Sequence, residues 1–402
     1  MIRVTCSKCG TAYKAAESSA GKSIRCKKCD ILIPVPAEGR TDEHADEAAV
    51  ETAHASPPAG QPAVLRGRVS EGDEWTSEDL SKISNLKAAH DRIMEQLRKA
   101  VVGQDQVVRL TMLGLFSQGH CLLMGVPGLG KTLLVRTLAS CLSLDFKRVQ
   151  FTPDLMPSDI TGTEVIQEDK ATGERQFRFL SGPIFTNILL ADEINRTPPK
   201  TQASLLESMQ ERQVTVGGVR RKLDEPFFVL ATQNPVEQEG TYPLPEAQLD
   251  RFMFQINVGY PTEDEEMQIL DMTTTGYKPQ VDPVLSKEEI LDLQQLVRKV
   301  KITEQVKRYV LKLVRATRAG EKEAPDFIKK WLTWGASPRA CQNLVLGAKA
   351  SAVLAGRNEA KLEDVREVAQ AVIGHRILPN FAAEAEGVTR EQIVDQLIQM
   401  VA

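Results

Sequence analysis

The sequence lacks the features of a secreted or membrane-spanning protein. Nowhere do roughly 18 consecutive apolar residues occur, and no apolar run follows a basic start near residue 1. We therefore expect no signal peptide and no membrane insertion, and we expect the protein to be cytoplasmic. Cysteine is scarce, with 7 residues among 402, and a reducing cytosol disfavours disulfides between them.

A net positive charge is also missing. The formal net charge is -4, so no global field attracts nucleic acid or an anionic membrane. Any basic surface therefore has to be local. What is present is enough apolar material for a sizeable core, because 42% of the residues are hydrophobic, and the length predicts two or three domains.

Four segments differ in composition. Residues 1–36 are compact and basic. Residues 37–74 contain no aromatic residue, and they contain clustered acidic residues and proline. This composition predicts a flexible linker. In residues 75–260 a helical stretch precedes short apolar strands that alternate with helices, the pattern of a parallel sheet covered by helices. Residues 261–402 have helical spacing throughout, so we expect a helical second domain.

A glycine-rich loop follows the apolar run at residues 121–124. It fits the template G-x-x-x-x-G-K-[ST], and helical spacing follows it. In such a loop the backbone N–H groups surround the phosphates at a helix N-terminus, Lys131 binds the β and γ oxygens, and the Thr132 hydroxyl binds Mg²⁺. The residues that we assign to ATP are Gly125, Val126, Pro127, Gly128, Leu129, Gly130, Lys131 and Thr132.

Two acids end the apolar strand expected at residues 188–192. Ligands bind where parallel strands end at one edge of a sheet. Asp192 would hold Mg²⁺, directly or through water, and Glu193 would polarise the water that attacks the γ-phosphate. A helix-capping acid is the structural alternative. The position downstream of the glycine-rich loop, with Asn195 and Arg196 following, disfavours it.

Taken together and in order, these motifs resemble the MoxR family of AAA+ ATPases. The resemblance covers about residues 82–376 and rests on the segments 102–104, 125–132, 191–196, 231–235, 249–252 and 337–339. It implies an α/β fold, in which a P-loop AAA+ core with a parallel sheet flanked by helices is followed by an all-helical lid. It also implies Mg²⁺-dependent hydrolysis of ATP in a homo-oligomeric, hexameric ring.

The resemblance also implies roles that the residues alone do not. Gly103 and Gln104 flank the adenine, and Asn234 is the sensor 1 residue. Arg251 is the best candidate for an arginine finger that reaches a neighbour's γ-phosphate, and Arg339 is sensor 2, carried by the lid. In isolation, an asparagine before proline is more often a turn residue, and a lone arginine is usually solvated.

Two further features match the family or its wider clade. Residues 161–181, rich in charge and carrying Thr172-Gly173, resemble a helix 2 insert hairpin that points into the central pore and would bear force on a client. Arg196 and Arg212 remain alternatives to Arg251 as the arginine that acts in trans.

Four cysteines near the N-terminus have metal-ligand spacing. Cys6-x-x-Cys9 and Cys26-x-x-Cys29 fit the four-thiolate zinc template and resemble a zinc ribbon. Zn²⁺ would supply the folding free energy that so small a module lacks. A site closed by four thiolates leaves no position for catalysis, so we expect docking or binding. Iron in place of zinc, and two redox pairs, remain alternatives.

Three functions compete. The first is a chaperone or assembly factor that remodels a protein client or loads a metal centre, and the complete set of hydrolysis motifs favours it. The second is a nucleic-acid motor or regulator that uses the basic ribbon, against which the acidic overall balance argues. The third is a nucleotide-switched adaptor, against which the intact Glu193 argues.

The remaining cysteines and two tryptophans receive a structural interpretation. Cys121, Cys141 and Cys341 are scattered, so we expect small buried hydrophobes. Trp331 and Trp334 are expected to pack the core of the helical domain.

Overall fold

The computed structural model forms two compact units, Met1–Arg68 and Val69–Ala402. The described residues are 2–5, 12–16, 22–29, 32–35, 75–168, 175–237, 240–276 and 279–401. Cys6, Cys9, the expected linker at residues 37–74 and Thr172-Gly173 lie outside them. Among the described residues, no helix combines the length and the apolar character that a bilayer crossing requires.

A five-stranded sheet with the order β13-β5-β12-β9-β6 forms the centre of the larger unit. Its strands are β5 (Cys121–Met124), β6 (Phe146–Gln150), β9 (Ile188–Asp192), β12 (Phe228–Gln233) and β13 (Phe254–Asn257). All neighbouring strands are parallel. Every residue of β9 is buried, and a strand covered on both faces reads as a continuous apolar run. The expected parallel α/β sheet is confirmed.

Helices cover both faces of this sheet. They are α1 (Ser77–Arg98), α2 (Asp105–Phe116), α3 (Lys131–Cys141), α4 (Pro157–Thr161), α5 (Pro199–Glu211), α6 (Glu246–Leu249) and the short η2 (Ile194–Arg196). Successive strand residues point to opposite faces. Leu190 accordingly packs in the cluster that contains the buried residues of α1, α2 and α3. Leu189 and Ala191 pack in the second cluster, with the buried residues of α4 and α5.

The helical lid that we expected after the sheet is confirmed. It comprises α7 (Glu263–Thr274), α8 (Lys287–Lys299), α9 (Glu304–Ala316), α10 (Asp326–Trp331), α11 (Pro338–Leu354), α12 (Leu362–Ile373), η3 (Gly374–Arg376), α13 (Phe381–Ala385) and α14 (Arg390–Val401). Two short strand pairs lie among the helices: β14 (Lys301–Ile302) with β16 (Glu359–Ala360), and β15 (Leu332–Trp334) with β17 (Leu378–Pro379). These strands are too short to leave a period-two pattern in the sequence.

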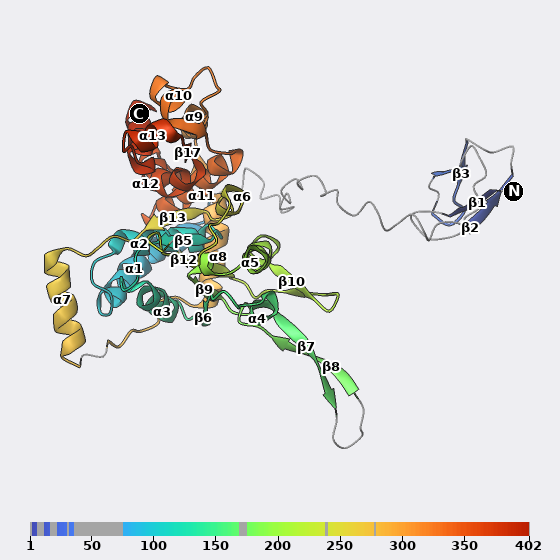
Figure 1. The fold of residues 1–402 in the computed structure, drawn as a ribbon, viewed down its shortest axis with the longest axis horizontal. Coiled ribbons are helices and arrows are strands. Elements are labelled where there is room, and N and C mark those ends of the chain that lie inside the picture. Colours follow the sequence, from blue (N-terminus) through green and yellow to red (C-terminus); the bar gives the residue numbers. More distant parts are fainter. Residues whose placement is uncertain are drawn as a thin grey trace. The chain divides into compact units, whose positions relative to one another are not determined.

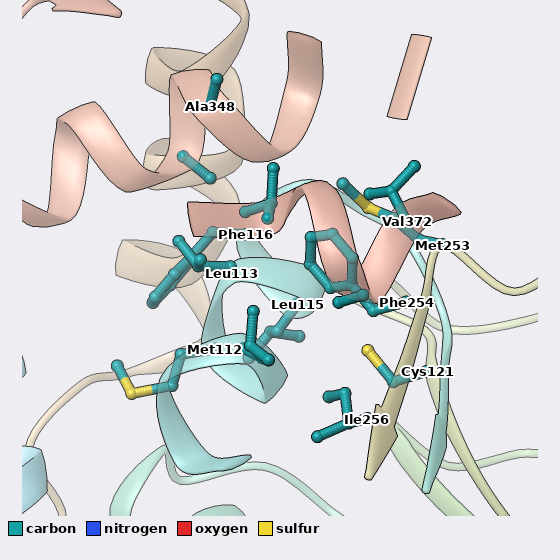
Figure 2. Packing of buried hydrophobic residues seen from close by; sticks show 14 of the residues in the cluster. Met112, Leu113, Leu115, Phe116, Cys121, Met253, Phe254, Ile256, Ala348 and Val372 are labelled. Atoms are coloured by element: carbon teal, nitrogen blue, oxygen red, sulfur yellow. The ribbon is translucent and has the colours of Figure 1, made fainter. Parts of the chain in front are cut away.

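The lid and the sheet share one apolar core. Figure 2 shows Phe116 of α2 and Phe254 of β13 together with Ala348 of α11 and Val372 of α12. Gly347 leaves room for the Phe254 ring, because a Cβ added at Gly347 would lie 3.1 Å from that ring. Burial of each large side chain contributes about 1.5–3 kcal/mol, so the lid is firmly attached to the sheet.

The tryptophan prediction was half wrong. Trp331 is partly buried against the lid core, but Trp334 is 70% exposed. Trp334 belongs to the short strand β15, where successive side chains alternate between the two faces. Its neighbour two positions earlier, Leu332, is buried. The bulge between these two residues turns the indole away from the core.

Two hairpins extend from the larger unit, drawn in green in Figure 1. The insert expected at residues 161–181 forms β7 (Gly162–Glu168) paired with β8 (Arg175–Ser181). The second hairpin pairs β10 (Gln213–Val216) with β11 (Val219–Lys222). Arg221 braces the two, because its guanidinium lies 3.8 Å from the Phe179 ring centroid and 3.4 Å from Glu164.

The N-terminal unit contains two small antiparallel strand pairs. They are β1 (Ile2–Thr5) with β2 (Ala12–Ala15), and β3 (Ser23–Arg25) with β4 (Leu32–Pro34). Its buried hydrophobic cluster consists of Val4, Ala15, Cys26 and Val35 among the described residues.

Candidate functional site

The glycine-rich loop joins the end of β5 to the start of α3. Gly128 and Gly130 have φ values of 87° and 69°, in the left-handed region that favours glycine. Lys131 turns back onto the loop, and its Nζ donates to the carbonyls of Gly125 and Val126 at 2.5 and 2.9 Å. Burial lowers the pKa of Lys131, while Asp192 and Glu193 oppose that shift. The ammonium group therefore lies where phosphate oxygens can replace the carbonyls.

Asp192 ends β9, and its two oxygens have different partners. Thr232 donates to Oδ1 at 2.6 Å. Arg148 lies on Oδ2, with Nε at 2.9 Å and Nη2 at 2.7 Å. The Thr132 hydroxyl is 3.5 Å from the same Oδ2. A carboxylate beside a P-loop hydroxyl is the oxygen donor set that Mg²⁺ prefers in nucleotide sites, so these residues fit the ion.

Glu193 follows in the left-handed conformation, with φ 56°. Its backbone N–H donates to the Thr232 hydroxyl at 2.8 Å. Its carboxylate accepts from Gln150 Nε2 at 2.6 Å and from Arg196 Nη1 at 3.0 Å. Such a backbone is strained in a residue other than glycine and persists only when neighbours hold it. Thr232 holds this backbone, while Gln150 and Arg196 hold the carboxylate.

Asn234 lies just past the end of β12, which runs between β5 and β9. Its Oδ1 accepts from Val236 N–H at 3.1 Å, and its Nδ2 is 3.5 Å from Glu237. Only 7% of the residue is exposed. The short turn that sequence reasoning offered as the alternative is thus present, and the same side chain also lines the site.

One cavity of about 440 Å³ brings these residues together. It is lined by Pro127, Gly128, Leu129, Gly130, Lys131, Thr132, Leu133, Arg148, Gln150, Asp192, Glu193, Thr232 and Asn234. The two acids and the amide that follow strands β9 and β12 therefore meet the glycine-rich loop at one edge of the sheet.

Arg148 and Gln150 were not predicted. Both belong to β6, the strand at the edge of the sheet next to β9, and they are two positions apart, so they share a face. Register places Gln150 opposite Asp192. The only signal in the sequence is two long polar side chains at alternate positions, which is ordinary for an edge strand.

Gly103 and Gln104 adopt left-handed conformations, with φ 65° and 61°. Gln104 Nε2 donates to the Leu129 carbonyl at 2.8 Å, which ties this segment to the glycine-rich loop. The other amide atom, Oε1, is buried without a partner among the described residues. An unpaired buried acceptor costs free energy, and an adenine amino group is a donor that would satisfy it. The segment fits a nucleotide base.

Arg339 lies outside the lining of that cavity, at a junction between lid and core. The junction is organised around Asp250. Arg376 donates to the Asp250 carboxylate at 2.7 Å, Ser337 lies 3.3 Å from it, and Arg339 lies 3.5 Å from it. Burial lowers the pKa of Arg376 to about 10, although Asp250 opposes the shift. Sequence reasoning did not single out Arg376.

Arg251 also lies outside the cavity lining, beside this junction. Burial lowers its pKa, with a further contribution from the nearby Arg339, while Glu207 opposes the shift. Within the described ranges its guanidinium makes no hydrogen bond or ion pair. A half-buried cation without a partner costs free energy unless an anion reaches it.

The two alternative arginines have partners within the chain. Arg196 bonds Glu193 and Glu237, both at 3.0 Å. Arg212 donates to Gln118 at 3.3 Å and lies 3.6 Å from Glu225. Arg196 therefore already binds Glu193 of its own subunit.

Half of the expected four-cysteine site can be described. Cys26 Sγ is 3.1 Å from the Tyr13 hydroxyl. This contact lowers the pKa of Cys26 to about 6, and the backbones of Lys28 and Cys29 add to the effect. Thiolate character and supporting hydrogen bonds are what a metal ligand needs. No group of three metal-ligating side chains occurs among the described residues, which exclude Cys6 and Cys9.

Comparisons with known proteins agree with this geometry. A family model described as the ATPase family associated with various cellular activities (AAA) matches residues 120–254, and an AAA lid domain matches residues 328–397. A crystal structure of a protein described as an ATPase, from Cytophaga hutchinsonii, has a TM-score of 0.74 and 43% identity. It covers 79% of this chain and 96% of its own.

Two curated relatives carry the same family name. Chaperone MoxR1 of Mycobacterium tuberculosis is 43% identical over 313 residues, which are 78% of this chain and 81% of that protein. Protein MoxR of Paracoccus denitrificans is 32% identical over 335 residues, covering 78% and 96%. Motifs, fold and relatives agree, and the chain belongs to the MoxR family of AAA+ ATPases.

Proposed function

We propose that this protein hydrolyses ATP to ADP and phosphate with Mg²⁺, in a hexameric ring in the cytoplasm, and uses the cycle as a chaperone or assembly factor. The observation that carries the proposal is the single cavity in which Lys131, Thr132, Asp192, Glu193 and Asn234 converge. The name of the relative Chaperone MoxR1 supports the chaperone role.

Each residue of the cavity has a distinct task. Bound Mg²⁺-ATP supplies the phosphoanhydride to be cleaved and a divalent charge that neutralises its oxygens. Lys131 holds the terminal phosphates, while Thr132 and Asp192 hold the ion. Glu193 orients and polarises the attacking water, because its carboxylate follows β9 at the cavity wall. Gly103 and Gln104 would hold the base, and Asn234 would help to position the water.

Arg251 is proposed to complete a neighbour's site. Its unpaired guanidinium needs an anion, and the γ-phosphate of an adjacent subunit is one. A residue that acts in the next site requires a head-to-tail interface, which closes into a ring. Arg339, carried by the lid, would respond to nucleotide from the same junction as sensor 2.

The client is proposed to contact the β7–β8 hairpin. Ile166 and Phe177 are cross-strand neighbours, 62% and 76% exposed. Two large apolar side chains that are paired and exposed favour an apolar partner. The Arg221 brace connects this hairpin to β11, whose chain leads into β12 and Asn234. The hairpin is therefore connected, through β11 and β12, to the cavity that we propose binds the nucleotide.

We also propose a domain organisation. It comprises a zinc-binding module at residues 1–36, a linker at 37–74, the ATPase core at 75–260 and the lid at 261–402. The hydrogen-bonded Cys26 thiol supports the zinc assignment. Because a four-thiolate site is closed, the module would dock a client rather than react.

The decisive experiment is steady-state hydrolysis of ATP across protein concentration, for the wild type and Glu193→Gln. We expect turnover per subunit to rise with concentration and to fall by at least about a hundredfold in the variant, while ATP binding is retained. Binding of ATP by the wild type without hydrolysis above the variant, at any concentration, would replace the motor with a nucleotide-switched adaptor.

A further inference from the structure

Helix α7 buries none of its residues in its own chain. Figure 1 shows the helix, in yellow, standing apart from the sheet and from the lid helices. Most helices in proteins are stabilised by tertiary packing of one face and only weakly by intrinsic propensity. A helix of three turns that covers no core of its own is therefore expected to pack against a partner.

One side of α7, which we call the outer face, combines apolar and acidic side chains. Glu263, Glu266, Met267 and Leu270 recur at helical spacing, so they lie on the same side. Met267 and Leu270 are 57% and 54% exposed. The two glutamates are exposed as well, and neither forms an ion pair with any residue that the structure describes. The outer face thus offers an apolar contact and two unpaired negative charges.

The start of α7 lies beside the proposed nucleotide site. The helix follows β13, and the N–H of Val258, just past that strand, donates to the Met124 carbonyl of β5 at 2.7 Å. The Glu265 carboxylate lies against Gly103 and fills the space that a Cβ would need there. The outer face therefore extends from the carboxyl edge of the sheet, the edge at which the cavity opens.

The amino edge of the same sheet carries positive charge that lacks a partner. Arg212 and Arg298 both donate to Gln118 Oε1 at 3.3 Å. Arg298 is half-buried and forms no ion pair within the described ranges. Burial lowers the pKa of Arg298, and the nearby Arg212 lowers it further. Gln118 precedes β5, just as Arg251 precedes the neighbouring strand β13, so these arginines belong to one edge.

We propose that the outer face of α7 docks on the amino edge of the sheet in a second copy of this chain, where Glu263 and Glu266 meet the unpaired Arg298. Charge complementarity selects this occupant, because α7 contains acids and no lysine or arginine. Continuity selects it too. A ring in which Arg251 reaches the next cavity brings an amino edge onto a carboxyl edge at every interface. The inference rests on the proposed ring and names a contact that holds it together.

The first test measures assembly of the full-length protein by sedimentation velocity with saturating Mg²⁺ and AMP-PNP. Met267→Ser with Leu270→Ser should raise the protein concentration at the assembly midpoint about tenfold or more, because the contact loses its apolar part. Gln268→Ser with Asp271→Ser repeats the spacing on another side of the helix and should stay within about twofold of the wild type. Retained binding of AMP-PNP in both double variants shows that each is folded.

The second test exchanges the charges between two chains. Glu263→Lys with Glu266→Lys should assemble poorly alone, and so should Arg298→Glu. An equal mixture of these two proteins should assemble within about threefold of the wild type, because every contact in an alternating ring then joins opposite charges. No recovery in the mixture, with AMP-PNP binding intact in both chains, would rule out Arg298 as the partner of α7.

The outcomes separate this contact from the proposed function. Wild-type assembly in Met267→Ser with Leu270→Ser would overturn the contact alone. If that variant also lost binding of reduced and carboxymethylated α-lactalbumin, α7 would be a client surface instead. A wild type that stayed monomeric at every concentration would overturn the proposed ring, and the contact with it.

Discussion

Thr232 serves both acids of the site with one hydroxyl. It donates to Asp192 and accepts from the backbone of Glu193, so one hydroxyl holds both the Asp192 carboxylate and the Glu193 main chain. Only 1% of Thr232 is exposed, and no water can take over these bonds. A buried strand residue therefore holds the two acids that line the cavity.

Thr232→Val should lower both stability and turnover. The change leaves the Glu193 N–H without its acceptor in a strained conformation, at a cost of about 1–3 kcal/mol. Thr232→Ser keeps the hydroxyl and is the matched control. Urea unfolding and steady-state turnover measure the two effects. Equal stability and turnover in the valine and serine variants would show that the hydroxyl does not position the acids.

His120 predicts how stability depends on pH. The ring is buried between the carbonyl of Met209 and the N–H of Val229, and burial lowers its pKa from 6.5 to about 4. The unfolded state therefore binds the proton first as the pH falls. The stabilisation is complete above pH 6.5 and is lost between about pH 6.5 and pH 4.

The expected loss from His120 is about 2 kcal/mol between pH 7.5 and pH 5. Burial also lowers the pKa of His375, which adds to the effect. Urea unfolding across this range measures the slope. His120→Gln retains one donor and one acceptor and should flatten the slope. An unchanged slope in that variant would mean that His120 is not the titrating group.

At the scale of elements, the β7–β8 hairpin carries an apolar and a polar cross-strand pair at adjacent positions, which point to opposite faces. One face carries the Ile166–Phe177 pair, and the other carries the Gln167–Gln176 pair. Neither pair is buried in the described fold. The Gln167–Gln176 pair is therefore a polar control for the apolar pair on the same backbone.

Replacing the apolar pair should uncouple the client from the ATPase. Ile166→Ser with Phe177→Ser should reduce binding of an unfolded model polypeptide, reduced and carboxymethylated α-lactalbumin, about tenfold or more. Basal ATP turnover should remain within about twofold of the wild type. Gln167→Ala with Gln176→Ala is the control on the opposite face. Equal loss in both double variants would point to a general disturbance of the hairpin.

At the scale of the whole molecule, the proposed active site is divided between subunits. Lys131 and Glu193 belong to one subunit, and Arg251 would come from the next. The Asp250 junction fixes the backbone beside Arg251 through Arg376, which is buried and bonds Asp250 and Phe252. The backbone that carries Arg251 is therefore held rigidly, as the backbone of an interface residue has to be.

Mixing two impaired variants tests this division. Arg251→Ala should bind ATP almost normally but turn over at least about tenfold more slowly, and Glu193→Gln should be inactive. In mixed rings, an intact Glu193 meets an intact Arg251 across some interfaces, so turnover should recover in part. Wild-type turnover in Arg251→Ala alone would transfer the role to Arg196 or Arg212.

The order of motifs along the chain was enough to predict the P-loop, the acids at the end of β9 and the helical lid. Each of these depends on local rules: glycines at positive φ, apolar runs for buried strands and helical spacing. No such local rule pointed to Arg148, Gln150 or Arg376. Their importance comes from residues far away in the sequence, namely Asp192, Glu193 and Asp250.

The sequence by itself therefore determined the chemistry, because phosphate and magnesium binding require particular residue types at particular spacings. Only the tertiary structure decided which charges meet. Arg148 contacts Asp192 because β6 and β9 are parallel neighbours in register. Arg376 and Arg339 engage Asp250, while the adjoining Arg251 makes no ion pair with any residue that the structure describes. Pairing between distant strands and helices is set by how the whole core packs, and no local pattern encodes it.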